Sequence, residues 1–150
     1  MIKKIAVLLV IILMFSNTAF AEKNITVTID NMLIEFDVQP MLINDRTMVP
    51  LRKIFEKLGA EVEWYDESQL VLATKNEVVI AMEIDKPSIS VTNVLEGKTD
   101  VIELDVAPML VDSRTLVPVR AISECLGYSV DWIDETNTVV INTDSVLRRD

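Results

Sequence analysis

The side chains best suited to chemistry in this sequence are four arginines, which form two pairs with the same spacing. Arg46 and Arg52 make one pair, and Arg114 and Arg120 make the other. A guanidinium group can hold a carboxylate or a phosphate through two parallel hydrogen bonds, so these arginines are the candidate partner-binding set. The alternative is a structural role, because Arg52 and Arg120 each precede a glutamate at the spacing of helical ion pairs. The structural role is favoured, because residues that stabilise a repeated fold are needed in both repeats.

Two acidic pairs, Asp66-Glu67 and Asp134-Glu135, could act as acid and base on a glycan. Glycosidases, however, place their two carboxylates on opposite sides of the scissile bond, about 5 to 9.5 Å apart. Neighbouring carboxylates in a turn do not meet this requirement, and the flanking residues are typical of hairpin turns. Both pairs are therefore interpreted as turn residues, and no catalytic residue is expected.

Two tryptophans, Trp64 and Trp132, could stack on sugar rings. Each shares its strand face with a valine, Val62 or Val130, in a segment whose intervening residues are acidic. Large aromatic side chains in that register usually contribute to a core. Core packing is therefore the expected role of both tryptophans.

The sequence offers few ligands for a metal or a cofactor. It contains no histidine, whereas copper in an oxidising site is held by imidazole groups. The single cysteine, Cys125, therefore lacks the usual base that would activate it as a nucleophile. We expect a partly buried thiol, with a disulfide to another chain as the alternative. No cofactor and no metal site are expected.

The candidate residues occur in pairs because the chain contains an internal repeat. Residues 40–74 and 108–142 align without a gap at an offset of 68, and 17 of the 35 positions are identical. The segments before them, 34–38 and 102–106, both alternate apolar and acidic residues. This alternation predicts a strand with one buried face in each repeat.

Each repeat also predicts one short helix. Pro50 and Pro118 suit the start of a helix, where the missing N–H is not needed. A stripe of apolar residues follows, and Gly59 and Gly127 stand where a helix ends in a left-handed residue. A hairpin is expected after each glycine, because turn residues then separate two β-branched runs.

The predicted fold class is α+β, with two pseudo-symmetric β-β-α-β-β units and an antiparallel sheet packed around two short helices. The units cover about residues 25–84 and 89–143, and each is too small to bury its own apolar face. Residues 22–150 are therefore expected to form a single domain. The second unit has no equivalent of the strand expected at 78–84, so its last strand is expected to leave an exposed edge.

Residues 1–21 are predicted to be a signal peptide. Two lysines are followed by an apolar run and by Ala19-Phe20-Ala21, the small-residue pattern of a cleavage site. The apolar run, 5–15, is too short to span a membrane as a helix, which takes about 20 residues. We therefore expect a secreted, extracellular or cell-wall-associated protein with no membrane span after cleavage.

The charge of the chain excludes one class of partner. It has 14 basic and 24 acidic side chains, and loss of Lys3 and Lys4 with the signal peptide would leave 12 − 24 = −12. Binding to a phosphate backbone relies on lysine and arginine. Nucleic acid is therefore not an expected partner.

A longer motif now connects these residues. The pattern R-T-x-V-P-x-R-x-I-x-E-x-L-G, followed by V-x-W-x-D-E, occurs twice. It resembles the copper amine oxidase N-terminal-like domain, or stalk domain, over about residues 25–143. The resemblance implies strands wrapped around a helix, in proteins exported by Gram-positive bacteria, and it implies no catalysis. It carries no copper chemistry, because histidine and the Asn-Tyr-Asp/Glu motif of the quinone cofactor are missing.

The expected function is a non-catalytic exported stalk or binding module at the bacterial cell envelope. Its expected partner is a cell-wall polymer or another envelope protein. One alternative is a carboxylate-dependent glycan hydrolase whose acids come together across the two repeats. The other is a structural protein that self-associates through the exposed edge strand.

Overall fold

The structure is a computed structural model that describes residues 24–144, so the predicted signal peptide lies outside the described residues. It is mostly β-sheet with two short helices, an α+β composition. The elements in chain order are β1 (Thr26–Ile29), β2 (Met32–Leu33), β3 (Met41–Ile43), β4 (Arg46–Pro50), α2 (Leu51–Lys57), β5 (Glu61–Tyr65), β6 (Leu70–Lys75), β7 (Val78–Glu83), β8 (Ser88–Asn93), β9 (Lys98–Glu103), β10 (Met109–Val111), β11 (Arg114–Pro118), α3 (Val119–Cys125), β12 (Ser129–Ile133), the 3-10 helix η1 (Asp134–Thr136) and β13 (Thr138–Asn142).

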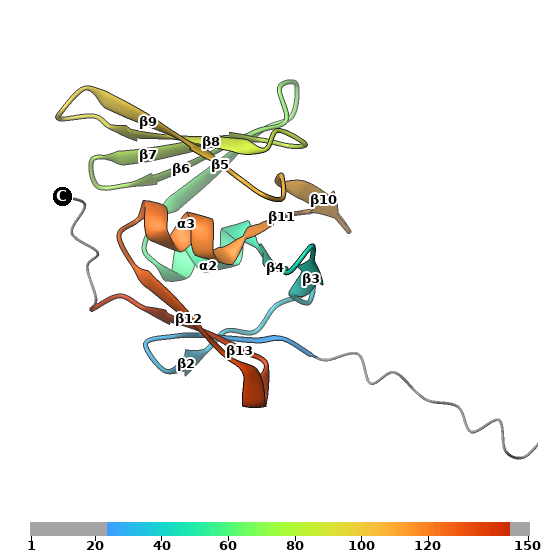
Figure 1. Ribbon diagram of the computed structural model, residues 1–150. Coiled ribbons are helices and arrows are strands. Elements are labelled where there is room, and N and C mark those ends of the chain that lie inside the picture. Colours follow the sequence, from blue (N-terminus) through green and yellow to red (C-terminus); the bar gives the residue numbers. More distant parts are fainter. Residues whose placement is uncertain (1–23, 145–150) are drawn as a thin grey trace, which may run out of the picture.

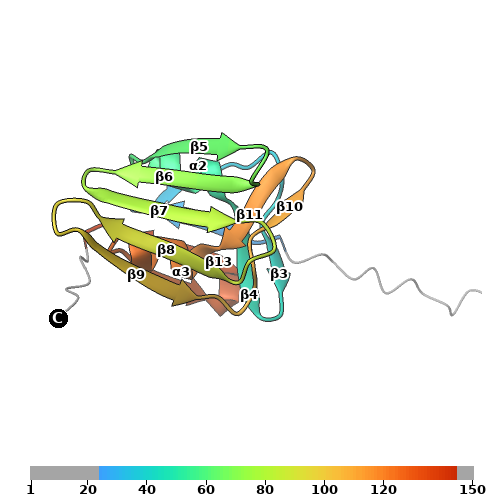
Figure 2. The ribbon, with the colours of Figure 1, turned by 90° about the horizontal axis from the view of Figure 1, so that it is seen from above.

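Three sheets surround the two helices. Sheet A has the strand order β12-β13-β1-β2, sheet B has β10-β11-β4-β3, and sheet C has β5-β6-β7-β8-β9. Figure 1 shows α2 and α3 between sheets A and C, with sheet B at one side of them. In the view of Figure 2 the strands of sheet C cover both helices. The main apolar core therefore forms between the layers with buried residues from both repeats, and a smaller cluster of Met48, Val106 and Leu116 lies beside it.

Both helices lie where the proline and glycine positions predict them. Pro50 and Pro118 immediately precede α2 and α3. Gly59 has φ = +79° and Gly127 has φ = +83°, in the left-handed region that favours glycine. The N–H groups of Gly59 and Ala60 donate to the carbonyl groups of Glu56 and Phe55, and the second repeat makes the equivalent pair of bonds. This double bond pattern is the Schellman motif, which satisfies the last helical carbonyls.

The two repeats meet along the centre of sheet B. Strands β4 and β11 pair in antiparallel fashion, with Val49 opposite Val117 and Met48 opposite Pro118. Because the repeat offset is 68, equivalent residues stand opposite one another at Val49 and Val117. Both valines are buried in the shared core, so the strands that precede the helices join the two repeats directly.

The outer hairpins of the two repeats join different sheets, which the sequence did not predict. Hairpin β5–β6 continues into β7 in sheet C, and all pairings of sheet C are antiparallel. Hairpin β12–β13 instead pairs with β1, and that pairing is parallel, with Val27 opposite Val139. The expectation of an exposed edge after the second repeat is therefore wrong, because β1 occupies the free side of β13. The expectation of an antiparallel sheet is also wrong at the pairing of β1 with β13, which is parallel.

The expected strand at 34–38 is also wrong. Its apolar residues are buried or half-buried and its acidic residues are exposed, but β2 ends at Leu33. Strand β2 is the edge of sheet A and pairs with β1 at only two positions. The Ile34 N–H still donates to the carbonyl of Val27 on β1 at 2.9 Å, but residues 35–38 join no strand among residues 24–144. In the second repeat β9 covers residues 98–103 and ends before residue 106.

Asp30 fastens the end of the second repeat to the first hairpin. One carboxylate oxygen accepts the Thr143 N–H at 2.8 Å, and the other accepts the Thr143 hydroxyl at 2.6 Å. These hydrogen bonds lower the pKa of Asp30 from its ordinary value of 3.8, although the side chain is exposed. The contact lies beside the β1–β13 pairing and thus helps to close sheet A.

This closure predicts acid sensitivity. A carboxyl group whose pKa is lower in the folded protein stabilises it above pH 3.8, and this stability is lost as the pH falls through the folded value. The free energy of unfolding should therefore decrease on acidification below pH 4, and Asp30→Asn should remove part of that decrease. Urea titrations between pH 3 and pH 6 measure both effects. An Asp30→Asn variant with an unchanged pH profile would contradict the role given to Asp30.

Within residues 24–144, neither helix has the length or the apolar character needed to cross a membrane.

Candidate functional site

Each repeat forms an open groove beside its helix. The groove of the first repeat, here named the Trp64 groove, has a volume of about 890 Å³. The residues that line it are Asp37, Pro50, Leu51, Arg52, Lys53, Glu56, Val62, Trp64, Asp66, Val71, Leu110, Ser113, Arg114 and Thr115. Shifted by 68 residues, every one of these positions also lines the groove of the second repeat. The two grooves are therefore equivalent features of the repeated sequence.

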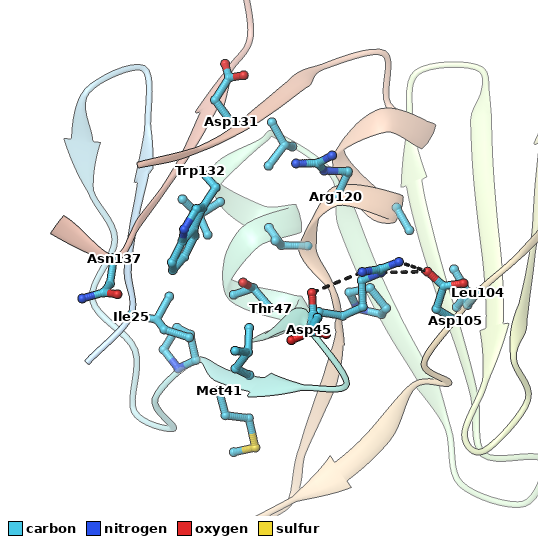
Figure 3. A pocket seen from close by; sticks show the side chains of 18 of the residues that line it. Ile25, Met41, Asp45, Thr47, Leu104, Asp105, Arg120, Asp131, Trp132 and Asn137 are labelled. Carbon is cyan, nitrogen blue, oxygen red and sulfur yellow. Dashed lines mark hydrogen bonds and ion pairs between the residues drawn. The ribbon is translucent and has the colours of Figure 1, made fainter. Parts of the chain in front are cut away.

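The groove of the second repeat, here named the Trp132 groove, is larger at about 1280 Å³ (Figure 3). Besides the equivalents of the Trp64 groove, it is lined by Asn24, Ile25, Gln39, Pro40, Met41, Ile102, Glu103, Leu104, Asp131 and Asn137. Two of these, Asn24 and Ile25, lead into β1, whereas the corresponding side of β6 is paired with β7 in antiparallel fashion. The parallel pairing of β1 with β13 therefore makes the two grooves unequal.

The two tryptophans differ in exposure, although the sequence predicts core packing for both. Trp64 is half-buried and packs against the core cluster. Trp132 is 36% exposed and does not belong to that cluster, so it is only partly buried. Figure 3 shows its ring extending into the groove toward Ile25 and Thr47. The wider space on this side leaves the indole face accessible.

The turn aspartates hold both indole rings. The Nε1–H of Trp132 donates to Asp134 at 2.6 Å, and the Nε1–H of Trp64 donates to Asp66 in the same way. An indole N–H has one donor and no acceptor, so this bond satisfies its only polar group. The acidic turn residues therefore orient the rings, which the sequence alone did not suggest.

Arg46 and Arg114 form reciprocal ion pairs across the repeats. The Nε–H of Arg46 donates to Asp105 at 2.7 Å, and the Nε–H of Arg114 donates to Asp37 at 2.7 Å. Each guanidinium also donates to the carbonyl of the preceding residue, at 3.2 Å in both repeats. The hydrogen bond from Arg114 lowers the pKa of Asp37. These two arginines are committed to contacts between the repeats, at the rims of the two grooves.

Arg52 and Arg120 lie in different surroundings despite their equivalent positions. Arg52 donates to the carbonyl oxygen of Val62 at 3.0 Å and lies 3.8 Å from Glu56, as the helical spacing predicts. Within residues 24–144, Arg120 makes neither contact and no other hydrogen bond or ion pair. Figure 3 shows it at the wall of the Trp132 groove. The four candidate arginines therefore do not meet in one place; two line each groove.

The two grooves also differ in charge. The Trp64 groove has three acidic and three basic lining residues, so their charges sum to 3 − 3 = 0. The Trp132 groove has six acidic and two basic lining residues, which gives 2 − 6 = −4. The acids are Asp45, Glu103, Asp105, Glu124, Asp131 and Asp134. Part of the difference comes from Lys53, whose equivalent in the second repeat is Ala121.

The chain matches one known family. The family model of the copper amine oxidase N-terminal domain covers residues 28–141, from β1 to β13. The chain belongs to this family. No curated protein matches it. The copper amine oxidase N-terminal domain is a non-catalytic module of the oxidases, and the match includes both repeats and all groove-lining residues except Asn24 and Ile25.

The family name raises the question of copper. The chain has no histidine, and residues 24–144 hold no cluster of three or more histidine, cysteine, aspartate or glutamate side chains suited to a metal ion. Cys125 is buried in α3 as part of the core. The side chains present therefore do not fit a copper site.

Proposed function

We propose that this protein is a non-catalytic exported module that binds its partner at the cell envelope through the Trp132 groove. The family supports the absence of catalysis, because the matched domain is a non-catalytic part of the oxidases. The positively charged and apolar start of the chain supports export. A cell-wall polymer or another envelope protein is the partner class that fits this location.

The proposal depends on one observation, which is that two equivalent tryptophans have different surroundings. A purely structural repeat would use Trp64 and Trp132 alike, yet Trp132 stands in an enlarged groove with 36% of its surface exposed. Exposed aromatic side chains in concave sites are typical anchors for partners, because they bury much area and lose little conformational entropy. The proposed partner contacts are Trp132 and Arg120.

Asp30 and Asp37 are not suited to be the general acid of a glycan hydrolase. Such an enzyme needs one carboxyl group with a raised pKa to act as the general acid. The pKa values of Asp30 and Asp37 are both lowered, by Thr143 and Arg114 respectively. The hydrogen bonds around these carboxyl groups therefore favour the charged form, the opposite of a general acid.

Replacing Trp132 with alanine tests the proposal. Loss of an anchoring aromatic ring should weaken binding to purified cell walls by about tenfold or more, which corresponds to ~1.4 kcal/mol. Co-sedimentation of the purified protein with washed cell walls measures the affinity. The thermal midpoint of the variant should change little, because Trp132 lies outside the core cluster.

The first repeat provides the matched control. Trp64→Ala removes the equivalent side chain, and it should reduce stability because Trp64 packs against the core. At a temperature where this variant is folded, its binding to cell walls should equal that of the unmodified protein. Equal loss of binding in both variants, or no loss in either, would rule out the Trp132 groove as the partner site.

A further inference from the structure

We propose that the Trp132 groove takes an extended, basic segment of a partner protein, with a lysine or arginine side chain placed over the indole ring. This inference rests on the proposed function, because it names the partner class for the same groove. The argument uses the charge of the groove, the strands that border it, the open side of β12, and the size of the space.

Charge favours a cationic partner. The ion pair between Arg46 and Asp105 is internally balanced, and Arg120 is offset in charge by Glu124 one helical turn away. Among residues 24–144, the other four lining acids form no ion pair with a basic side chain, namely Asp45, Glu103, Asp131 and Asp134. A lysine or arginine side chain above the face of an indole gains from the negative ring face as well as from these carboxylates. A second copy of this acidic chain is a poor occupant, because it would add negative charge.

The strands that border the groove favour an extended peptide. Strand β3 is one edge of sheet B, β9 is one edge of sheet C, and β12 is one edge of sheet A. All three contribute lining residues to the Trp132 groove: Met41 and Leu42, Glu103, and Val130 to Trp132. Edge strands offer backbone N–H and C=O groups that an added strand can use, which is the mode of β-strand addition.

The equivalent edge in the first repeat is already occupied. There the guanidinium of Arg52 donates to the carbonyl oxygen of Val62 on β5, which is the edge strand of sheet C. The equivalent residues Arg120 and Val130 are not joined in this way within residues 24–144. A backbone carbonyl and a guanidinium group on the groove wall are therefore accessible to the main chain of a bound segment.

The size of the groove also indicates a chain rather than a small molecule. Pockets for small molecules usually measure about 300–1,000 Å³, whereas the Trp132 groove measures about 1280 Å³ and is open. A segment of several residues fits such an open groove along the edge strands. The Trp64 groove, smaller and neutral in sum, does not share these features.

Fluorescence titration with defined probes tests the inference. In the Trp64→Phe variant only Trp132 emits, so its signal reports on the groove. The probes are the capped peptides Lys-Val-Lys-Val-Lys-Val and Glu-Val-Glu-Val-Glu-Val, and the neutral glycan chitohexaose. We expect the lysine peptide to change the emission and bind at least tenfold more tightly than either other probe. The affinity should fall severalfold between low and high salt, because exposed charges are screened.

Two double variants separate the groove from the overall charge. Glu103→Gln with Asp131→Asn should weaken binding of the lysine peptide at least fivefold. Glu35→Gln with Glu63→Gln removes the equivalent charges of the first repeat, neither of which lines a groove, and should leave binding unchanged. Equal weakening in both would overturn the inference, because the effect would then come from net charge.

The remaining outcomes distinguish this inference from the proposed function. Binding of chitohexaose without binding of the lysine peptide would overturn the basic-segment inference and keep the groove as a partner site for glycans. Lysine-peptide binding that survives Trp132→Ala, measured by isothermal titration calorimetry because this variant lacks the reporting indole, would also overturn it. The proposed function would be contradicted by a different result, namely cell-wall binding that does not depend on Trp132.

Discussion

Phe55→Ala should lower the free energy of unfolding by about 3–5 kcal/mol. Phe55 lies on α2, has no exposed surface, and packs in the core between sheets A and C. Removal of a buried phenylalanine side chain loses its transfer free energy and leaves a cavity that the surrounding layers fill only in part. Equilibrium unfolding in urea or guanidinium chloride, followed by circular dichroism, measures the change.

The equivalent position in the second repeat is a matched control with the opposite expected sign. Ser123 is also fully buried, but its hydroxyl has no hydrogen-bond partner within residues 24–144. A buried polar group without a partner costs about 1–3 kcal/mol, so Ser123→Ala should leave stability unchanged or raise it by about 1 kcal/mol. A loss of 3 kcal/mol in Ser123→Ala, or less than 1 kcal/mol in Phe55→Ala, would contradict the described packing.

Val27→Asp should leave the protein largely unfolded. Val27 has no exposed surface and lies on β1 opposite Val139, in the parallel pairing that covers the free side of β13. A carboxylate buried there without a partner costs several kcal/mol, a large part of the 5–15 kcal/mol that stabilises a typical domain. Loss of β1 should also uncover the edge of β13 and promote association between chains. Circular dichroism and light scattering over a concentration series measure the two effects.

Leu33→Asp is the control for Val27→Asp within the same hairpin. Leu33 lies on β2 with 62% of its surface exposed, so an added charge there remains in water. Its free energy of unfolding should stay within about 0.5 kcal/mol of the unmodified protein. A Val27→Asp variant that folds normally and remains monomeric would show that β1 is dispensable for the core.

The local elements were predictable because their causes are local. Pro50 and Gly59 set the limits of α2 through their own backbone preferences, and Pro118 and Gly127 do the same for α3. The short turns between β3 and β4 and between β10 and β11 also follow from residue type. Asn44 and Asp45 both have positive φ, of 48° and 60°, as a two-residue hairpin turn requires.

The candidate site was predictable only in its residue types. The repeated motif singled out Arg52, Arg120, Trp64 and Trp132, but it gave each pair one common role. Exposure and contacts differ within each pair because β13 pairs with β1 in parallel fashion, whereas β6 pairs with β7 in antiparallel fashion. The shared motif cannot encode such a difference, since β1 and β13 pair between residues 139 − 27 = 112 positions apart.

The sequence alone indicates the repeat. It also indicates the two helices with their ends, the hairpins and the buried stripes, because each of these depends on residues within a few positions of one another. The tertiary structure decided which sheet each hairpin joins, the parallel contact of β1 with β13, and the enlargement of the Trp132 groove. Strand pairing between distant segments depends on which free edge is available and on which apolar face remains to be covered. The free edge and the uncovered apolar face are defined only after the other layers have formed.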